Sequence, residues 1–105
     1  MQESELFFGL SRPDGSTISE SEWQAFVDQE VTPRFTAGLT VSQAQGQWLG
    51  NNGAVVKEGS RVLTLIYPMR EEQSLRGVDE IRALYQSQFD QESVMRLDSH
   101  RCVSF

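Results

Sequence analysis

The sequence predicts an α+β fold, and three observations support this prediction. Hydrophobic residues alternate with a period of two in four segments, which begin near Leu6, Leu39, Val55 and Met95. In two further segments they recur every three or four residues, from about Trp23 and from about Val78. The pair Asn52-Gly53, a strong hairpin signal, lies between the two middle strands. This order of elements predicts a ferredoxin-like βαββαβ sandwich, in which a four-stranded antiparallel sheet carries two helices on one face.

Length and composition are typical of one small domain. The chain of 105 residues has room for a single core, so we expect residues 1–105 to form one domain. Hydrophobic residues make up 38% of the chain and charged residues 23%, as in ordinary soluble proteins. The net charge of −6, without a cluster of Lys or Arg, would repel nucleic acids and anionic membranes. We therefore expect neither as a partner, and no apolar run is long enough for a membrane span.

Residues 6–10, Leu-Phe-Phe-Gly-Leu, predict the first strand. Both alternating sets of positions are apolar, which is typical of a strand covered on both faces. A turn follows at residues 12–16, because Pro13 fixes its own φ and Gly15 tolerates a positive one.

Ser19 and Glu22 have the spacing of a capping box and predict the start of the first helix. Apolar residues then fall on one helical face: Trp23, Phe26, Val27 and Val31. Pro33 ends the regular helix, because the residue before a proline is disfavoured in the α conformation.

The second strand begins at Leu39, and its pattern is irregular. Val41 shares the parity of Leu39, whereas Ala44 and Trp48 have the opposite parity. A regular strand cannot place both sets on one buried face, so we expect a β-bulge near residues 42–43.

The third strand extends over residues 55–67 and is apolar in both parities, so it too is predicted to be covered on both faces. A proline and a polar loop over residues 68–74 separate it from the second helix. The apolar face of that helix contains Val78, Ile81, Tyr85 and Phe89. The last strand is predicted over residues 94–105, at an edge of the sheet because Met95 and Leu97 alternate with charged residues.

The two inner strands predict that the fold is incomplete as a single copy. Leaving four large side chains exposed would forfeit about 6–12 kcal/mol, at about 1.5–3 kcal/mol each. That is comparable with the whole stability of a domain. We expect a second copy, packed sheet to sheet as a homodimer, to cover the second face. A loop of the same chain or a bound apolar ligand is the alternative cover.

One group of polar and aromatic residues predicts a ligand site near the hairpin. In a hairpin that closes at Asn52-Gly53, Trp48 pairs near Lys57 or Glu58. An aromatic wall beside a carboxylate and a guanidinium suits a small apolar or aromatic ligand. The candidate binding residues are Arg34, Gln47, Trp48, Glu58, Arg61 and Tyr67. The alternative is structural, a cross-strand ion pair with Trp48 as its apolar lid.

Other chemistry has little support in the sequence. His100 is the only histidine and Cys102 the only cysteine, so neither a usual zinc site nor an intramolecular disulfide is expected. We expect a solvated His100 and a small buried Cys102, with a Cys–His pair on one strand face as the alternative. No catalytic residue is assigned, and no metal or cofactor is expected.

Several blocks of the sequence form a recognisable series. They are residues 5–11 (ELFFGLS), 21–26 (SEWQAF), 30–35 (EVTPRF), 38–41 (GLTV), 46–48 (GQW), 91–94 (QESV) and 102–105 (CVSF). The chain thereby resembles a bacterial family, domain of unknown function 3574, over nearly its whole length. The resemblance implies a small α+β domain, often carried behind an export signal or lipoprotein leader, and it brings no activity or substrate. We expect a cytoplasmic protein if the chain is complete, and an exported or periplasmic one if a leader was removed.

Together these observations favour a small soluble bacterial domain that works as a homodimeric ligand-binding or interaction module. The alternative is a cofactor-independent oxygenase- or isomerase-like enzyme of the dimeric α+β barrel type, by analogy of fold alone. Such an enzyme needs a closed cavity of about 300–1,000 Å³ lined by Trp48, Tyr67, Arg34 or Glu58. A third hypothesis is an exported accessory protein whose partner covers the second sheet face.

Overall fold

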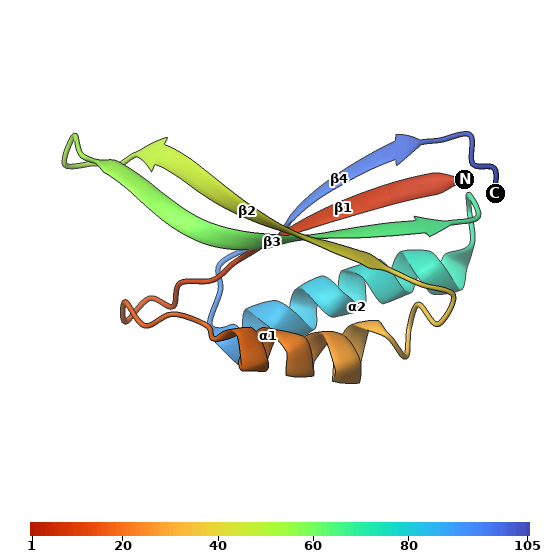
Figure 1. The fold of residues 1–105 in the computed structure, drawn as a ribbon, viewed down its shortest axis with the longest axis horizontal. Helices are drawn as coiled ribbons and strands as arrows, with labels where there is room; N and C mark the ends of the chain where they lie inside the picture. Colours follow the sequence, from red (N-terminus) through yellow and green to blue (C-terminus); the bar gives the residue numbers. More distant parts are fainter.

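Two helices lie on one face of a four-stranded sheet in the computed structural model, which describes residues 1–105 (Figure 1). The elements in chain order are β1 (Gln2–Gly9), α1 (Glu20–Phe26), the π-helical segment η1 (Val27–Val31), β2 (Thr40–Leu49), β3 (Val55–Tyr67), α2 (Glu72–Phe89) and β4 (Met95–His100). The strands have the order β2-β3-β1-β4, and every neighbouring pair is antiparallel. This arrangement confirms the predicted ferredoxin-like α+β sandwich.

The core lies between the helices and the inner strands β1 and β3. Alternate residues of these strands face the helices and are buried: Leu6, Phe8, Leu63, Leu65 and Tyr67. The ring of Phe8 is central, with its centroid 5.0 Å from that of Trp23 and 4.7 Å from that of Tyr85. Each of these large side chains contributes about 1.5–3 kcal/mol by leaving water. The predicted apolar faces of both helices are buried in this core, which confirms them.

The first helix begins as the sequence predicts. The Ser19 hydroxyl accepts a hydrogen bond of 3.1 Å from the backbone N–H of Glu22, and the Glu22 carboxylate accepts one of 3.0 Å from the backbone N–H of Ser19. The helix then widens into the π-helical turn η1, whose two valines remain buried. The sequence pattern does not predict this wider turn.

The β2–β3 hairpin has an unbroken register and extends beyond the helices (Figure 1). Every β2 residue has a one-to-one partner on β3, so the predicted bulge at residues 42–43 was wrong. The bulge was inferred from conflicting apolar parities, but all of β2 is exposed, and neither face of the strand has to be apolar. The turn at Gly50–Gly53 pairs Trp48 with Val56, one residue earlier than predicted.

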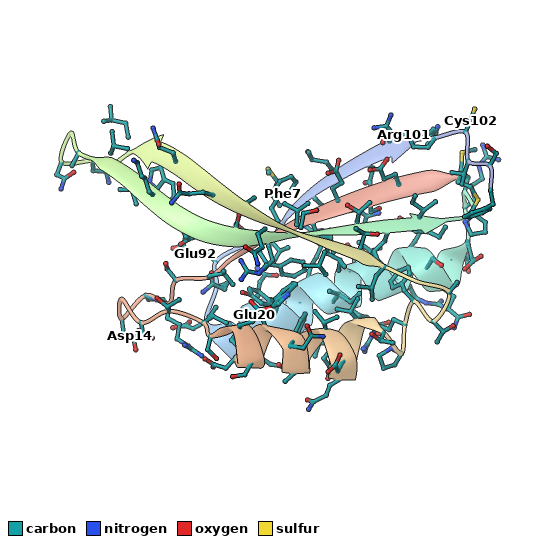
Figure 2. All side chains as sticks on the ribbon, in the orientation of Figure 1. Phe7, Asp14, Glu20, Glu92, Arg101 and Cys102 are labelled. Atoms are coloured by element: carbon teal, nitrogen blue, oxygen red, sulfur yellow. The ribbon has the colours of Figure 1, made fainter.

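The edge strand β4 lies next to β1 and ends at His100, which is exposed as expected. The predicted strand over residues 94–105 was too long, because the chain beside it ends: β1 begins at Gln2, and beyond His100 only Arg101 still bonds a neighbour, the backbone of Met1. Cys102 lies in this C-terminal tail and is exposed (Figure 2). The prediction that it is a small buried residue was therefore wrong.

No helix lies on the sheet face opposite α1 and α2, which is called the open face below (Figure 1). Phe7 projects from this face (Figure 2), opposite Val62 of β3. Large apolar side chains remain half exposed on it: Trp48 (49%), Ile66 (45%), Met95 (52%) and Leu97 (48%). The open face of the inner strands is mixed: Phe7, Val62 and Ile66 are apolar, whereas β1 also presents Glu3 and Glu5 there. The prediction that both inner strands are apolar on both faces is thus borne out only in part, and most of the exposed apolar side chains belong to the edge strands.

Candidate functional site

A cavity of about 670 Å³ lies on the open face, where the end of β1 meets the β2–β3 hairpin. Its walls come from β1 and the turn that follows it, from both hairpin strands, and from the segment between α2 and β4. Small-molecule sites occupy about 300–1,000 Å³, so this cavity has the size of a ligand site.

Three apolar side chains from three different strands line the cavity: Phe7, Trp48 and Met95. Phe7 shares the open face with Met95 because the two are directly opposite in the sheet register. Trp48 is on this face as well, because its partner Val56 is six residues, an even number, from Val62, the β3 partner of Phe7. Nearly half of the surface of Trp48 is exposed, so its indole ring is accessible from the cavity. An exposed indole is a strong anchor for a flat, apolar ligand group.

The carboxylate of Glu58 lies over the backbone of Gly9 in the same cavity. A Cβ on Gly9 would overlap Oε1 of Glu58 and would stand 3.4 Å from Oε1 of Gln91. Glycine at this position therefore provides the space that the carboxylate occupies. No ion pair of the chain includes Glu58. The side chain of Glu58 also forms no hydrogen bond, yet it is not among the fully buried groups that lack a partner. It is only partly buried, so its carboxylate oxygens are accessible from the cavity.

Tyr85 fixes the backbone beneath this carboxylate. Its hydroxyl donates a hydrogen bond of 2.6 Å to the carbonyl oxygen of Gly9. Burial raises the pKa of the Tyr85 phenol well above its usual value, and the negative charge of Glu58 raises it further. Tyr85 is therefore a neutral hydrogen-bond donor at physiological pH, and it holds Gly9 in place.

The cavity has an acidic lining. Asp90 and Glu92 line it together with Glu58, and none of these three carboxylates forms an ion pair within the chain. Arg12 is the one basic residue of the lining, and its guanidinium is already paired with the carboxylate of Glu22. The resulting potential favours ligands with positive charge or hydrogen-bond donors.

The structure brings two of the six predicted binding residues together. Trp48 and Glu58 lie on neighbouring strands and share the open face, because Val56, two residues before Glu58, is the direct partner of Trp48. Such diagonal positions are about 7–8 Å apart in a sheet. Their role in binding stays a prediction.

Three of the other predicted residues lie away from the cavity. Gln47 is on the opposite face of the hairpin. Arg61 faces the helices and pairs with Glu20 at 2.6 Å. Tyr67 is buried in the core, where its hydroxyl is 2.7 Å from Oγ of Ser4. None of these three side chains lines the cavity, and the polar groups of Arg61 and Tyr67 have partners elsewhere in the fold.

Arg34 lies in a second, smaller hollow of about 330 Å³, which Glu80, Ala83 and Leu84 of α2 also line. Its guanidinium is 3.1 Å from the carboxylate of Glu30 and 3.0 Å from that of Glu80. These two carboxylates satisfy the charge of Arg34, and the hollow is on the helical side of the sheet. The open-face cavity is the better candidate site.

Sequence reasoning missed the cavity residues that come from β1 and from the segment after α2, among them Gly9, Arg12 and Gln91. The crossover connections bring these residues beside the hairpin only in the folded sheet. One signal was present in the sequence: a glycine inside an apolar strand is typical of a close approach by another group. Gly9 is such a glycine.

The fold and the cavity define a ferredoxin-like domain with a pocket on its open sheet face. The model of the family described as Protein of unknown function (DUF3574) matches residues 3–105, so the chain belongs to this family. This match confirms the resemblance found in the sequence. No curated protein matches the chain.

Solved structures with the same fold include a phage SAM lyase in complex with S-methyl-5'-thioadenosine. That structure is 18% identical, with a TM-score of 0.73, over 95% of this chain and 81% of the lyase. The apo state of a phage SAM lyase is 18% identical, with a TM-score of 0.69, over 93% and 78%. CutA from Synechococcus elongatus is 16% identical, with a TM-score of 0.57, over 95% and 77%. At these identities the likeness is one of fold.

No helix combines the length and the apolar character that a membrane crossing requires. No three or more His, Cys, Asp or Glu side chains are grouped so that they could hold a metal ion.

Proposed function

We propose that this domain binds a small aromatic molecule in the open-face cavity and that two copies associate through the same face. The observation that carries the proposal is that an accessible indole ring and an unpaired carboxylate line one cavity of ligand size. Trp48 provides the stacking surface, and Glu58 provides the polar group that orients the ligand.

The second copy in this proposal follows from apolar side chains along the open face. Ile66 and Leu97 are about half exposed there outside the cavity lining, as are Trp48 and Met95 within it. Exposed apolar side chains on three of the four strands, β2, β3 and β4, are typical of an interface. A two-fold axis would set the same patch of each copy against the other, which gives a homodimer. The partner's sheet would then also close the cavity against water.

The phage SAM lyase structure supplies a probe for this proposal. It is in complex with S-methyl-5'-thioadenosine, a molecule with a flat purine ring. Its likeness to this chain is one of fold, so the molecule serves as a probe and is not assigned as the ligand.

Calorimetric titration with two uncharged aromatic probes, S-methyl-5'-thioadenosine and 2-phenylethanol, tests the proposal. We expect at least one of them to bind and Trp48→Ala to weaken that binding about tenfold, because the stacking surface is lost. Leu49→Ala is the matched control, since Leu49 is exposed at the end of the same strand but on the opposite face. The proposal fails if no aromatic probe binds, or if both variants weaken binding equally.

A second candidate function is catalysis, and the phage SAM lyase neighbour is the observation that favours it. Incubation of the protein with SAM, followed by detection of S-methyl-5'-thioadenosine, tests a lyase activity. If the native protein forms S-methyl-5'-thioadenosine and the Glu58→Gln variant does not, this candidate is supported. If the native protein forms none, this candidate is removed. The oxygenase or isomerase alternative needs a closed cavity, whereas this one is lined by Trp48 and Glu58 but open in a single copy.

A further inference from the structure

We propose that the ligand of the open-face cavity is an organic cation with a flat ring, of the arylalkylammonium type. This inference rests on the proposed function, namely that the cavity binds an aromatic molecule. It adds the charge of the ligand, which the acidic lining and the position of one carboxylate define.

The negative charges that line the cavity outnumber the positive ones. Glu58, Asp90 and Glu92 contribute three carboxylates without ion-pair partners in the chain. Arg12 contributes the only positive charge, and Glu22 neutralises it. A bound anion would therefore meet uncompensated negative charge, whereas a bound cation would supply the missing partner.

The fold itself determines the position of the Glu58 side chain. This side chain does not extend into solvent but lies partly buried against Gly9, in the space that any larger residue would fill. The hydrogen bond from Tyr85 to the carbonyl of Gly9 holds the supporting backbone. The fold thus keeps a negative charge at a fixed point of the cavity, where a cation can approach it.

The ring and the charge line the same cavity. Trp48 and Glu58 occupy diagonal positions of the hairpin, a relation in which residues are about 7–8 Å apart, and the Glu58 carboxylate extends from there toward Gly9 of β1. A ligand with a flexible link between its ring and its ammonium group can contact both the indole and the carboxylate. The face of an indole also attracts cations directly, so both residues favour the same ligand charge.

Three probes that share one ring and differ in charge test the inference: 2-phenylethylammonium, 2-phenylethanol and 3-phenylpropionate. Nuclear magnetic resonance titration of the labelled full chain follows the indole N–H of Trp48 and gives each dissociation constant. We expect the cation to bind about tenfold more tightly than the alcohol, and the anion to bind most weakly. The advantage of the cation is expected to shrink as salt is added.

Three variants locate the source of this preference. Glu58→Gln is expected to reduce the affinity for the cation to that for the alcohol, and to leave the affinity for the alcohol unchanged. Gly9→Ala keeps the net charge but displaces the Glu58 carboxylate, and it is expected to have a similar effect. Glu5→Gln is the control, because it removes one negative charge from the open face outside the cavity lining and is expected to keep the preference.

The outcomes separate this inference from the proposed function. If the ammonium and the alcohol bind equally well to the native protein, the cation inference is wrong and aromatic binding stands. If none of the three probes moves the Trp48 resonance, the proposed function itself is wrong. If Glu5→Gln removes the preference as fully as Glu58→Gln, the effect belongs to the overall charge of −6, and the inference fails.

Discussion

Trp48 and Glu58 share the open face of the hairpin because the turn at Gly50–Gly53 sets the register between their strands. A shift of one residue in this register would move Glu58 to the opposite face from Trp48. Gly53 carries the turn with a φ of 81°, in the left-handed region that favours glycine. The geometry of the candidate site therefore depends on a residue that lies outside it.

Replacement of Gly53 is expected to weaken the site without touching it. Gly53→Ala strains the turn by about 1–2 kcal/mol and should reduce the affinity for 2-phenylethylammonium several-fold, as measured by titration. Gly38→Ala is the matched control, because Gly38 has a φ of 139° and equally open surroundings but lies in the loop before β2, at the end of the hairpin away from its turn. Equal affinity in the two variants would contradict a role for the hairpin register.

A charge on the open face is expected to separate the two copies. Light scattering should give twice the chain mass of 11.9 kDa for the native protein. Ile66→Lys should give the mass of one chain, because two lysines cannot be desolvated against an apolar sheet. Met69→Lys is the control, since Met69 is 46% exposed, as Ile66 is at 45%, but lies in the loop before α2. A native monomer, or dissociation by both variants, would count against the dimer.

Tyr67 is expected to act in stability and not in binding. Its hydroxyl is 2.7 Å from Oγ of Ser4, which in turn donates to the carboxylate of Asp98 at 2.5 Å. Tyr67→Phe should lower the free energy of unfolding by about 1 kcal/mol in a urea titration, because a buried hydrogen bond is lost. The affinity for 2-phenylethanol should be unchanged, and a loss of affinity at full stability would return Tyr67 to the site.

Acid is expected to weaken the fold partly through Asp98. Burial opposes the charge of this carboxylate, but hydrogen bonds from Ser4 and Arg96 outweigh burial and hold its pKa below the usual value. Its contribution to stability is therefore present above the ordinary aspartate pKa of about 3.9 and is lost as the pH falls through the lower folded value. Asp98→Asn should be less stable than the native protein at pH 6, and this difference should begin to narrow as the pH falls below about 4. A difference that stays constant with pH would contradict this role.

The order of elements could be predicted from the sequence because it depends on local patterns. The capping box of Ser19 and the spacing from Val78 to Phe89 are properties of single segments, and the structure confirmed the helix that each one predicts. The bulge predicted at residues 42–43 failed for a reason outside the segment. It assumed that β2 buries one face, whereas this strand extends past the helices and buries neither.

The candidate site was less predictable, because it depends on the exact register and on distant segments. A one-residue error at the turn paired Trp48 with the wrong neighbour. Arg34 and Arg61 were grouped with it by sequence distance, but their carboxylate partners are on the helices. Gly9 and Gln91 reach the cavity through the two crossovers, and no spacing along the chain indicates that approach.

The central claim is that the open-face cavity is a binding site, and a map of resonance changes on titration with 2-phenylethylammonium tests it most directly. We predict that the signals of Trp48, Glu58 and Gly9 shift together and saturate, while the signal of Gln47 on the opposite face stays in place. Shifts that are absent, that do not saturate, or that centre on Arg34 in the helical hollow would contradict the account.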